Sequence, residues 1–174
     1  RRLHEHELTR PALAPRTYTA GESHRYLGRQ YRLSVASGRR ASVRPSSGRL
    51  VVLVPDSQDF PSVRRALERW YLARAKTVLP VRLDRLLAQP CLHGLQPAAI
   101  RVQRMRKRWG SCSSSGRLLL NTDLVLLPVS LIDYVLVHEL CHLRVRSHGA
   151  EFERQLARAL PDWRARHRQL GACR

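Results

Sequence analysis

The chain has 174 residues, and 43% of them are hydrophobic, which suits one domain with a buried core and argues against general disorder. No run supplies the roughly 18 consecutive apolar residues of a membrane helix, and the opening stretch lacks the apolar core of a secretory signal. We therefore expect no membrane partner. The four cysteines contain no CxxC pair, so neither a zinc ribbon nor a disulfide framework is indicated, and we expect a cytoplasmic protein.

The charge of the chain is extreme. Lysine and arginine total 32 against 13 acidic residues, a net charge of +19, and only Lys76 and Lys107 are lysines. Codon bias in a GC-rich genome can explain the preference for arginine, but it explains the excess of positive charge less well. A domain this basic attracts polyanions whatever its role. We therefore expect affinity for anions, whereas charge alone does not establish a nucleic-acid function.

The first third of the chain predicts strands. Residues 1–17 contain prolines and several charges and predict a loose lead-in to a single domain over residues 18–174. Between residues 26 and 55, apolar and polar residues alternate, and the pairs Ser37-Gly38 and Ser47-Gly48 interrupt the alternation as turns. This pattern predicts a small antiparallel β-meander.

The rest of the chain predicts a mixture of helices and strands, so the fold class is α+β. Residues 59–89 show helical spacing, with Asp59 or Ser62 as a cap, and one side carries Val63, Leu67, Trp70 and Tyr71. A short sheet is expected within residues 98–122, and helices are expected over residues 128–170.

The stretch VLVHELCHLRVRSH, residues 135–148, contains the spacing H-E-x-x-H. His138 and His142 are one helical turn apart, so one tetrahedral zinc ion can accept both nitrogens at about 2.0–2.1 Å. Glu139 is rotated off that face and can act as the general base for a zinc-bound water. The alternative is an ordinary buried helix. That alternative is costly, because two histidines and a glutamate on an apolar helix need a partner such as a metal.

A third ligand is needed to complete a catalytic zinc site, and two alternatives are open. His148 follows His142 by six residues, the spacing found in H-E-x-x-H-x-x-G-x-x-H, although Val145 holds the place of the glycine. Glu151 or Glu153 on the next helix would instead give a set of two histidines and a glutamate. We favour His148 and expect one zinc ion per chain.

The loop RWGSCSSSG precedes the motif by a short distance. Trp109 and Ser111 are candidates for the wall of a substrate cleft, and the strand RLLLN, which ends at Asn121, is the candidate for its edge. A flexible hairpin connection is the alternative. Cys112 lacks support as a nucleophile, and Cys141 is expected to be a small core residue.

Basic residues cluster immediately before this loop. They can form a polyanion track that leads to the cleft, or they can be a solvated face without a ligand. The members of this predicted track are Arg101, Arg104, Arg106, Lys107 and Arg108.

The sequence pieces RWGSCS, GRLLLN, PVSLIDYVLVHELCHL and PDW resemble the YgjP-like family of predicted zinc metallopeptidases, which are relatives of the SprT-like and WLM domains. The similarity spans about residues 26–170. It implies a zincin-like, helical metal-binding region, with zinc bound by His138, His142 and His148 and with Glu139 as the catalytic base. In one departure from the family pattern, Phe152 is followed by glutamate rather than by a second aromatic residue.

The function favoured by the motif and the resemblance is a zinc-dependent metallopeptidase that hydrolyses peptide bonds of a protein or peptide with an activated water. One alternative is a metal-dependent pyrophosphatase of nucleoside triphosphates such as UTP, a label that some proteins of this family carry. The chain has no Gly-rich phosphate loop to support it. The other alternative is a non-catalytic, zinc-braced module that binds nucleic acid. Glu139 argues against it, because a structural site fills its fourth position with cysteine or histidine. The sequence does not indicate the oligomeric state.

Overall fold

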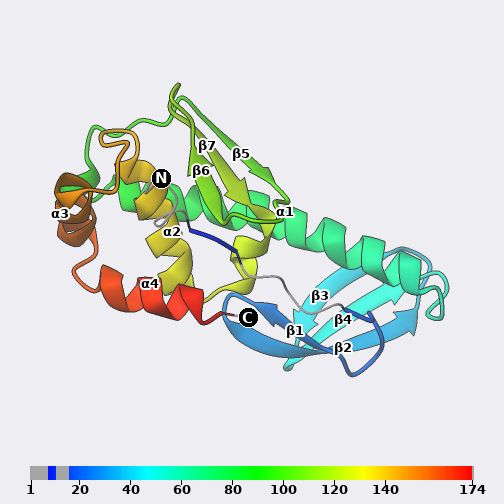
Figure 1. The fold of residues 1–174 in the computed structure, drawn as a ribbon. Coiled ribbons are helices and arrows are strands. Elements are labelled where there is room, and N and C mark those ends of the chain that lie inside the picture. Colours follow the sequence, from blue (N-terminus) through cyan, green and yellow to red (C-terminus); the bar gives the residue numbers. More distant parts are fainter. Residues whose placement is uncertain (1–7, 11–15, 174) are drawn as a thin grey trace.

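The computed structural model describes residues 8–10 and 16–173. A long helix, α1, crosses the molecule (Figure 1). A four-stranded sheet packs against one end of α1, and a three-stranded sheet and the helices α2, α3 and α4 lie toward its other end. The fold is α+β, as predicted.

The N-terminal sheet has the strand order β1-β2-β4-β3, with β2 and β4 parallel. The predicted antiparallel meander is therefore wrong for β2 and β4, whereas β1 and β2, and likewise β3 and β4, pair antiparallel, and the strands lie where the alternation indicated. Leu50, Val52 and Val54 of β4 are fully buried, so β4 takes an inner position, whereas Pro45 lacks an N–H group and suits the edge strand β3. The strands are β1 (Ser23–Tyr26), β2 (Arg29–Ser37), β3 (Ser42–Ser46) and β4 (Arg49–Val54).

Helix α1 (Phe60–Leu87) confirms the prediction for residues 59–89. The Asp59 carboxylate accepts a hydrogen bond from the backbone N–H of Ser62, which satisfies one of the free donors at the helix start. The apolar side of the helix packs on β3, β4, β5 and α2, so α1 is the element that joins the two sheets. Its buried residues include Val63, Leu67, Tyr71, Leu79 and Leu83.

The second sheet has the order β5-β7-β6, with β5 parallel and β6 antiparallel to β7. The strand RLLLN is therefore the central strand, and the prediction that it forms the edge is wrong. Leu118 and Leu120 are 1% and 0% exposed and belong in the middle of a covered sheet, which leaves the short β6 as an edge. The strands are β5 (Ala99–Gln103), β6 (Gly110–Cys112) and β7 (Arg117–Asn121).

Helix α2 (Val129–Cys141) is the most enclosed α-helix of the C-terminal half. Every residue from Tyr134 to Cys141 is buried, because α2 contacts α1, α3, α4 and β6. The remaining elements are α3 (Ala150–Ala159), α4 (Trp163–Gly171) and the 3-10 turns η1 (Pro90–Leu92) and η2 (Thr122–Leu126). Within the described part of the chain, no helix combines the length and the apolar character needed to cross a membrane.

Residues 8–10 form a strap against the second sheet. The N–H of Trp109 donates to the carbonyl of Leu8, and the N–H of Arg10 donates to the carbonyl of Lys107. The Arg10 guanidinium forms a largely buried ion pair with Asp123. The prediction of a loose lead-in is therefore wrong at these residues. Packing against the sheet buries the leucine and forms the ion pair, which fixes the segment in place. The other residues of that lead-in lie outside the described residues, apart from Arg16 and Thr17.

Candidate metal centre

Three histidines converge at the C-terminal end of α2. His138 and His142 are one turn apart on the helix, and their ring centroids are 5.0 Å apart. His148 lies on the segment after α2, and its Nε2 atom is 3.1 Å from Nε2 of His138. One ligand nitrogen from each of the three histidines lies within 4.8 Å of the others. The structure thus brings together the three residues that the sequence singled out.

This donor set fits a zinc ion. Two nitrogens bound to one tetrahedral zinc at about 2.0–2.1 Å would be about 3.4 Å apart, close to the 3.1 Å between Nε2 of His138 and Nε2 of His148. Nδ1 of His142 is 3.1 Å from the carbonyl of Val145 and can donate to it, which leaves Nε2 with its lone pair for a metal. Burial lowers the pKa of His142 and favours the neutral imidazole that a metal requires.

A tight turn returns His148 to the helix end. The N–H groups of Arg144 and Val145 both donate to the carbonyl of Cys141, which turns the chain immediately after the helix. Arg146 then fixes the turn to the hairpin between β6 and β7, because its guanidinium donates to the carbonyls of Cys112, Ser113 and Ser114 at 3.4, 2.7 and 2.9 Å. Sequence reasoning missed Arg146, since one arginine among so many gives no signal of its own.

Phe152 forms an apolar floor under the histidines. Its ring centroid is 4.9 Å from that of His138 and 4.7 Å from those of His142 and His148, and its side chain is buried.

The two glutamates that were considered as metal ligands instead form ion pairs with arginines. Glu151 pairs with Arg154, and Glu153 pairs with Arg164 at 2.7 Å. The three-histidine set is therefore the better candidate than two histidines with a glutamate.

Glu139 lies between α2 and the edge strand β6, and its side chain is 3% exposed. A Cβ atom added to Gly110 would be 2.8 Å from both Cγ and Oε1 of Glu139, a separation that atoms of this kind do not adopt. Glycine is therefore the residue that lets the strand approach the carboxylate. The sequence analysis did not predict this role, although Gly110 belongs to the loop RWGSCSSSG.

The three cleft candidates have different positions. Trp109 is 1% exposed, so it is a core residue under Arg10 and not a cleft wall. Asn121 is fully buried, and its amide donates to the carbonyls of Met105 and Arg108 while its oxygen accepts from the N–H of Asp123. It braces the loop before β6, because a buried amide must satisfy its hydrogen bonds internally. Ser111 remains partly exposed.

The thiols in this region are unsuited to nucleophilic attack. Burial raises the pKa of Cys112, and it raises the pKa of Cys141 to about 12, so both remain protonated at neutral pH. Cys141 is a buried core residue, as expected from the sequence.

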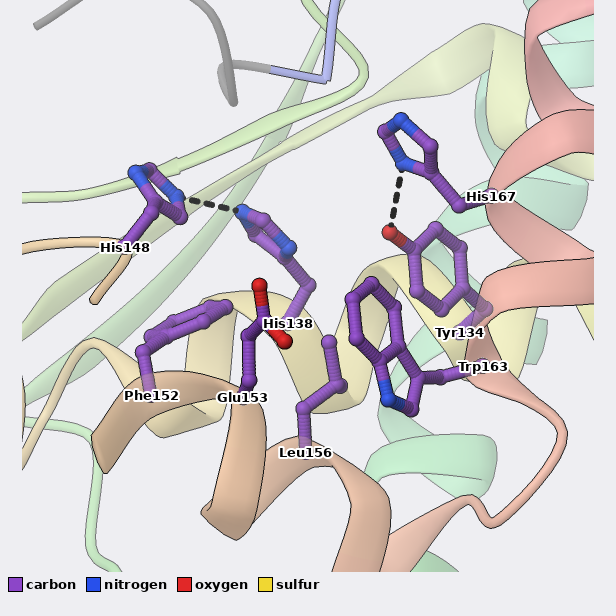
Figure 2. Close-up of a pocket in the computed structure, with 8 residues that line it drawn as sticks. All are labelled: Tyr134, His138, His148, Phe152, Glu153, Leu156, Trp163 and His167. Atoms are coloured by element: carbon purple, nitrogen blue, oxygen red, sulfur yellow. Dashed lines mark hydrogen bonds between the residues drawn. The ribbon is translucent and has the colours of Figure 1, made fainter. Parts of the chain in front are cut away.

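A small hollow opens beside His138 and His148, between α2, α3 and α4 (Figure 2). The hydroxyl of Tyr134 is 2.9 Å from Nδ1 of His167, and this hydrogen bond joins α2 to α4. Burial raises the pKa of Tyr134, which keeps the hydroxyl protonated. Glu153 lines the hollow at the position where the family pattern led us to expect a second aromatic residue.

The fold directs the members of the predicted basic track to different places. All five of its members are exposed, but Arg104 turns toward α1 and pairs with Glu68 at 2.9 Å. Arg101 and Arg108 instead line a hollow with Arg117, a residue that the sequence analysis did not include.

Comparison with known proteins adds independent information. A family model described as YgjP-like, metallopeptidase domain, matches residues 1–172. No curated protein matches the sequence. The metallopeptidase zymogen of Pyrococcus abyssi abylysin is a similar solved structure, with 22% identity and a TM-score of 0.45 over 53% of this chain and 88% of that chain. The metallopeptidase zymogen of Methanocaldococcus jannaschii jannalysin gives 22% identity and a TM-score of 0.43 over 52% of this chain and 94% of that chain.

The family match spans almost the whole chain and includes all three clustered histidines and Glu139. It agrees with the motif quoted from the sequence and with the convergence of imidazoles in the structure. The chain belongs to the YgjP-like family and is a metallopeptidase.

Proposed function

We propose that the metal of this peptidase is zinc, with one ion per chain held by His138, His142 and His148, and that Glu139 is the general base. The observation that carries the proposal is the convergence of three imidazole nitrogens beside a buried glutamate. When bound, zinc supplies Lewis acidity and makes a water molecule acidic enough to lose a proton at neutral pH. The substrates are proteins or peptides.

The burial of Glu139 beside the histidines supports a role in proton transfer. Its carboxylate takes a proton from the attacking water and later delivers it to the leaving amine. Contact with Gly110 on one side and the body of α2 on the other restricts the carboxylate to a narrow space. Its low exposure also strengthens its interactions with developing charge, because little water is present to screen them.

The edge of β6 provides a surface for the substrate backbone. The N–H of Ser113 donates to the carbonyl of Arg117 and the N–H of Asn121 donates to the carbonyl of Trp109, both at 2.9 Å, so Ser113 and the carbonyl of Trp109 face β7. Alternate residues of an antiparallel strand face opposite sides, so Gly110 and Cys112 direct their backbone groups outward. Arg146 already occupies the carbonyl of Cys112. We expect an extended peptide to pair with this edge of β6, beside Glu139.

The test compares zinc-loaded wild type with Glu139→Gln on a fluorescently labelled unfolded protein and on UTP. We expect wild type to cleave the protein and the variant to retain zinc while losing about 10²–10⁴-fold in rate, because an amide cannot accept the proton. Turnover of UTP without turnover of protein would contradict the proposal and favour the pyrophosphatase alternative. Equal rates for the two forms would remove Glu139 from the mechanism.

We also propose a reducing, cytoplasmic location. All four cysteines are free thiols in the structure, as expected for a protein kept in a reducing compartment. Four titratable thiols in protein unfolded after purification without reductant would support the proposal, and fewer would contradict it.

A further inference from the structure

The second sheet has an outer face that is rich in arginine. Leu118 and Leu120 of β7 point into the core, so Arg117 and Leu119 point to the opposite, outer face. The strand register places Arg101 of β5 and Ser111 of β6 on either side of Leu119. The fold thus gathers on one face side chains that are distant in sequence.

These residues line a hollow, called here the arginine hollow. It is lined by Ala98, Ala99, Arg101, Arg108, Ser111, Cys112, Ser113, Ser115, Arg117, Leu118 and Leu119. Three guanidinium groups and three serine hydroxyls therefore surround it, and none of the described residues that line it is acidic or aromatic.

Arg101 and Arg117 lack the carboxylate partners that several other surface arginines have. Arg64 and Arg104 pair with Glu68, Arg154 pairs with Glu151, and Arg164 pairs with Glu153. Arg101 and Arg117, in contrast, have no ion pair within the described part of the chain. The charges of Arg101 and Arg117 repel one another, so an anionic ligand that lies between them relieves this repulsion.

We propose that the arginine hollow binds the phosphate backbone of a nucleic-acid duplex. Guanidinium groups bind phosphate oxygens in pairs, and hydroxyls and backbone N–H groups provide the usual additional contacts. Single-stranded nucleic acid is bound with the help of aromatic side chains on which bases stack, and the described lining of the hollow contains none. A duplex, which keeps its bases stacked internally, matches this chemistry better.

The position of the hollow separates this inference from the peptidase proposal. Successive side chains of a strand point to opposite faces, so Ser111 faces the hollow while the neighbouring Gly110 faces Glu139. A duplex in the hollow therefore lies across β6 from the carboxylate and contacts none of the three histidines. Binding requires neither zinc nor peptide hydrolysis.

The experiment measures the affinity of the full chain for a short DNA duplex of mixed sequence by fluorescence anisotropy at several salt concentrations. The variant Arg101→Gln/Arg117→Gln removes two guanidinium groups of the hollow. We expect the slope of log affinity against log salt to fall by about 1.8, roughly 0.9 for each lost phosphate contact. Arg101→Lys/Arg117→Lys keeps the charge, and we expect it to retain most of the slope.

The matched control is Arg29→Gln/Arg49→Gln, which removes the same net charge from exposed positions of the N-terminal sheet. We expect this control to change the slope only slightly. Equal losses in the two double variants would overturn the proposal, because net charge alone would then account for the binding. Tighter binding of polyglutamate or of single-stranded DNA than of the duplex, with the same dependence on Arg101 and Arg117, would also overturn it. Zinc content and thermal unfolding verify that each variant is folded.

Discussion

The two sheets of this protein are built from similar sequence patterns but differ in what they do. The N-terminal sheet has longer strands with clear alternation, and α1 covers it with a large apolar surface. The second sheet contains β6, a strand of three residues, yet Gly110 in that strand lies against Glu139. The N-terminal sheet therefore contributes mainly to stability, whereas the second sheet contributes to the candidate active site. The strand with the weakest periodic signal is the one at the site.

The largest expected effect is on metal binding. His148→Ala removes one of three converging imidazoles, so we expect most of the zinc to be lost and hydrolysis with it. Metal content after dialysis, measured by atomic absorption, checks this. Glu151→Ala is the matched variant on the neighbouring helix and should retain zinc. Loss of zinc in the glutamate variant but not in the histidine variant would show that the ligand assignment is wrong.

The second prediction tests the contact between β6 and the helix. Gly110→Ala places a methyl group 2.8 Å from the Glu139 carboxylate, so either the side chain or the strand must shift. We expect a loss in kcat of about 10²-fold, the scale typical of a displaced catalytic group, with zinc retained. Gly38→Ala is the control in the N-terminal sheet, where the added atom meets Leu53 at 3.2 Å. We expect it to leave kcat unchanged, and an equal loss in both variants would contradict the distinction between the sheets.

The third prediction concerns Arg146. Removing its guanidinium in Arg146→Ala frees three carbonyls of the hairpin and loosens the turn that carries His148. We expect zinc affinity to fall by about 10-fold, as for other residues that orient a metal ligand, with little change in thermal stability. Competition with a chelator measures the affinity. Arg144 lies on the same turn but donates to the carbonyl of His93, so Arg144→Ala should have a smaller effect.

The smallest effect is expected at the start of α1. Asp59→Ala removes the helix cap, so it should lower the melting temperature modestly and leave hydrolysis unchanged. The hydrogen bonds from Ser62 lower the pKa of Asp59. The stabilisation is therefore complete above the usual carboxyl pKa and is lost as the pH falls through the lowered value. Melting curves of both forms should converge in strong acid, and a constant difference would contradict this origin.

Sequence alone predicted the parts of the fold that depend on neighbouring residues. Helical spacing and capping gave α1, and the H-E-x-x-H spacing on an apolar helix gave His138, Glu139 and His142. The order of strands in both sheets was missed, because pairing depends on which strand is buried on both faces. The positions of Trp109 and Asn121 were also missed. Exposure of a residue in a polar loop depends on segments distant in sequence, here Arg10 and Met105.

The strap at residues 8–10 has a consequence for the order of folding. Its ion pair joins residues that are 113 positions apart, and its other contacts also reach the segment before β6. Such a contact closes a very long loop, so it forms only after the intervening chain has collapsed and the second sheet exists. The earliest described residues of the chain therefore reach their final place late. During synthesis, the contacts of residues 8–10 with the segment before β6 therefore stay incomplete until Asp123 has emerged.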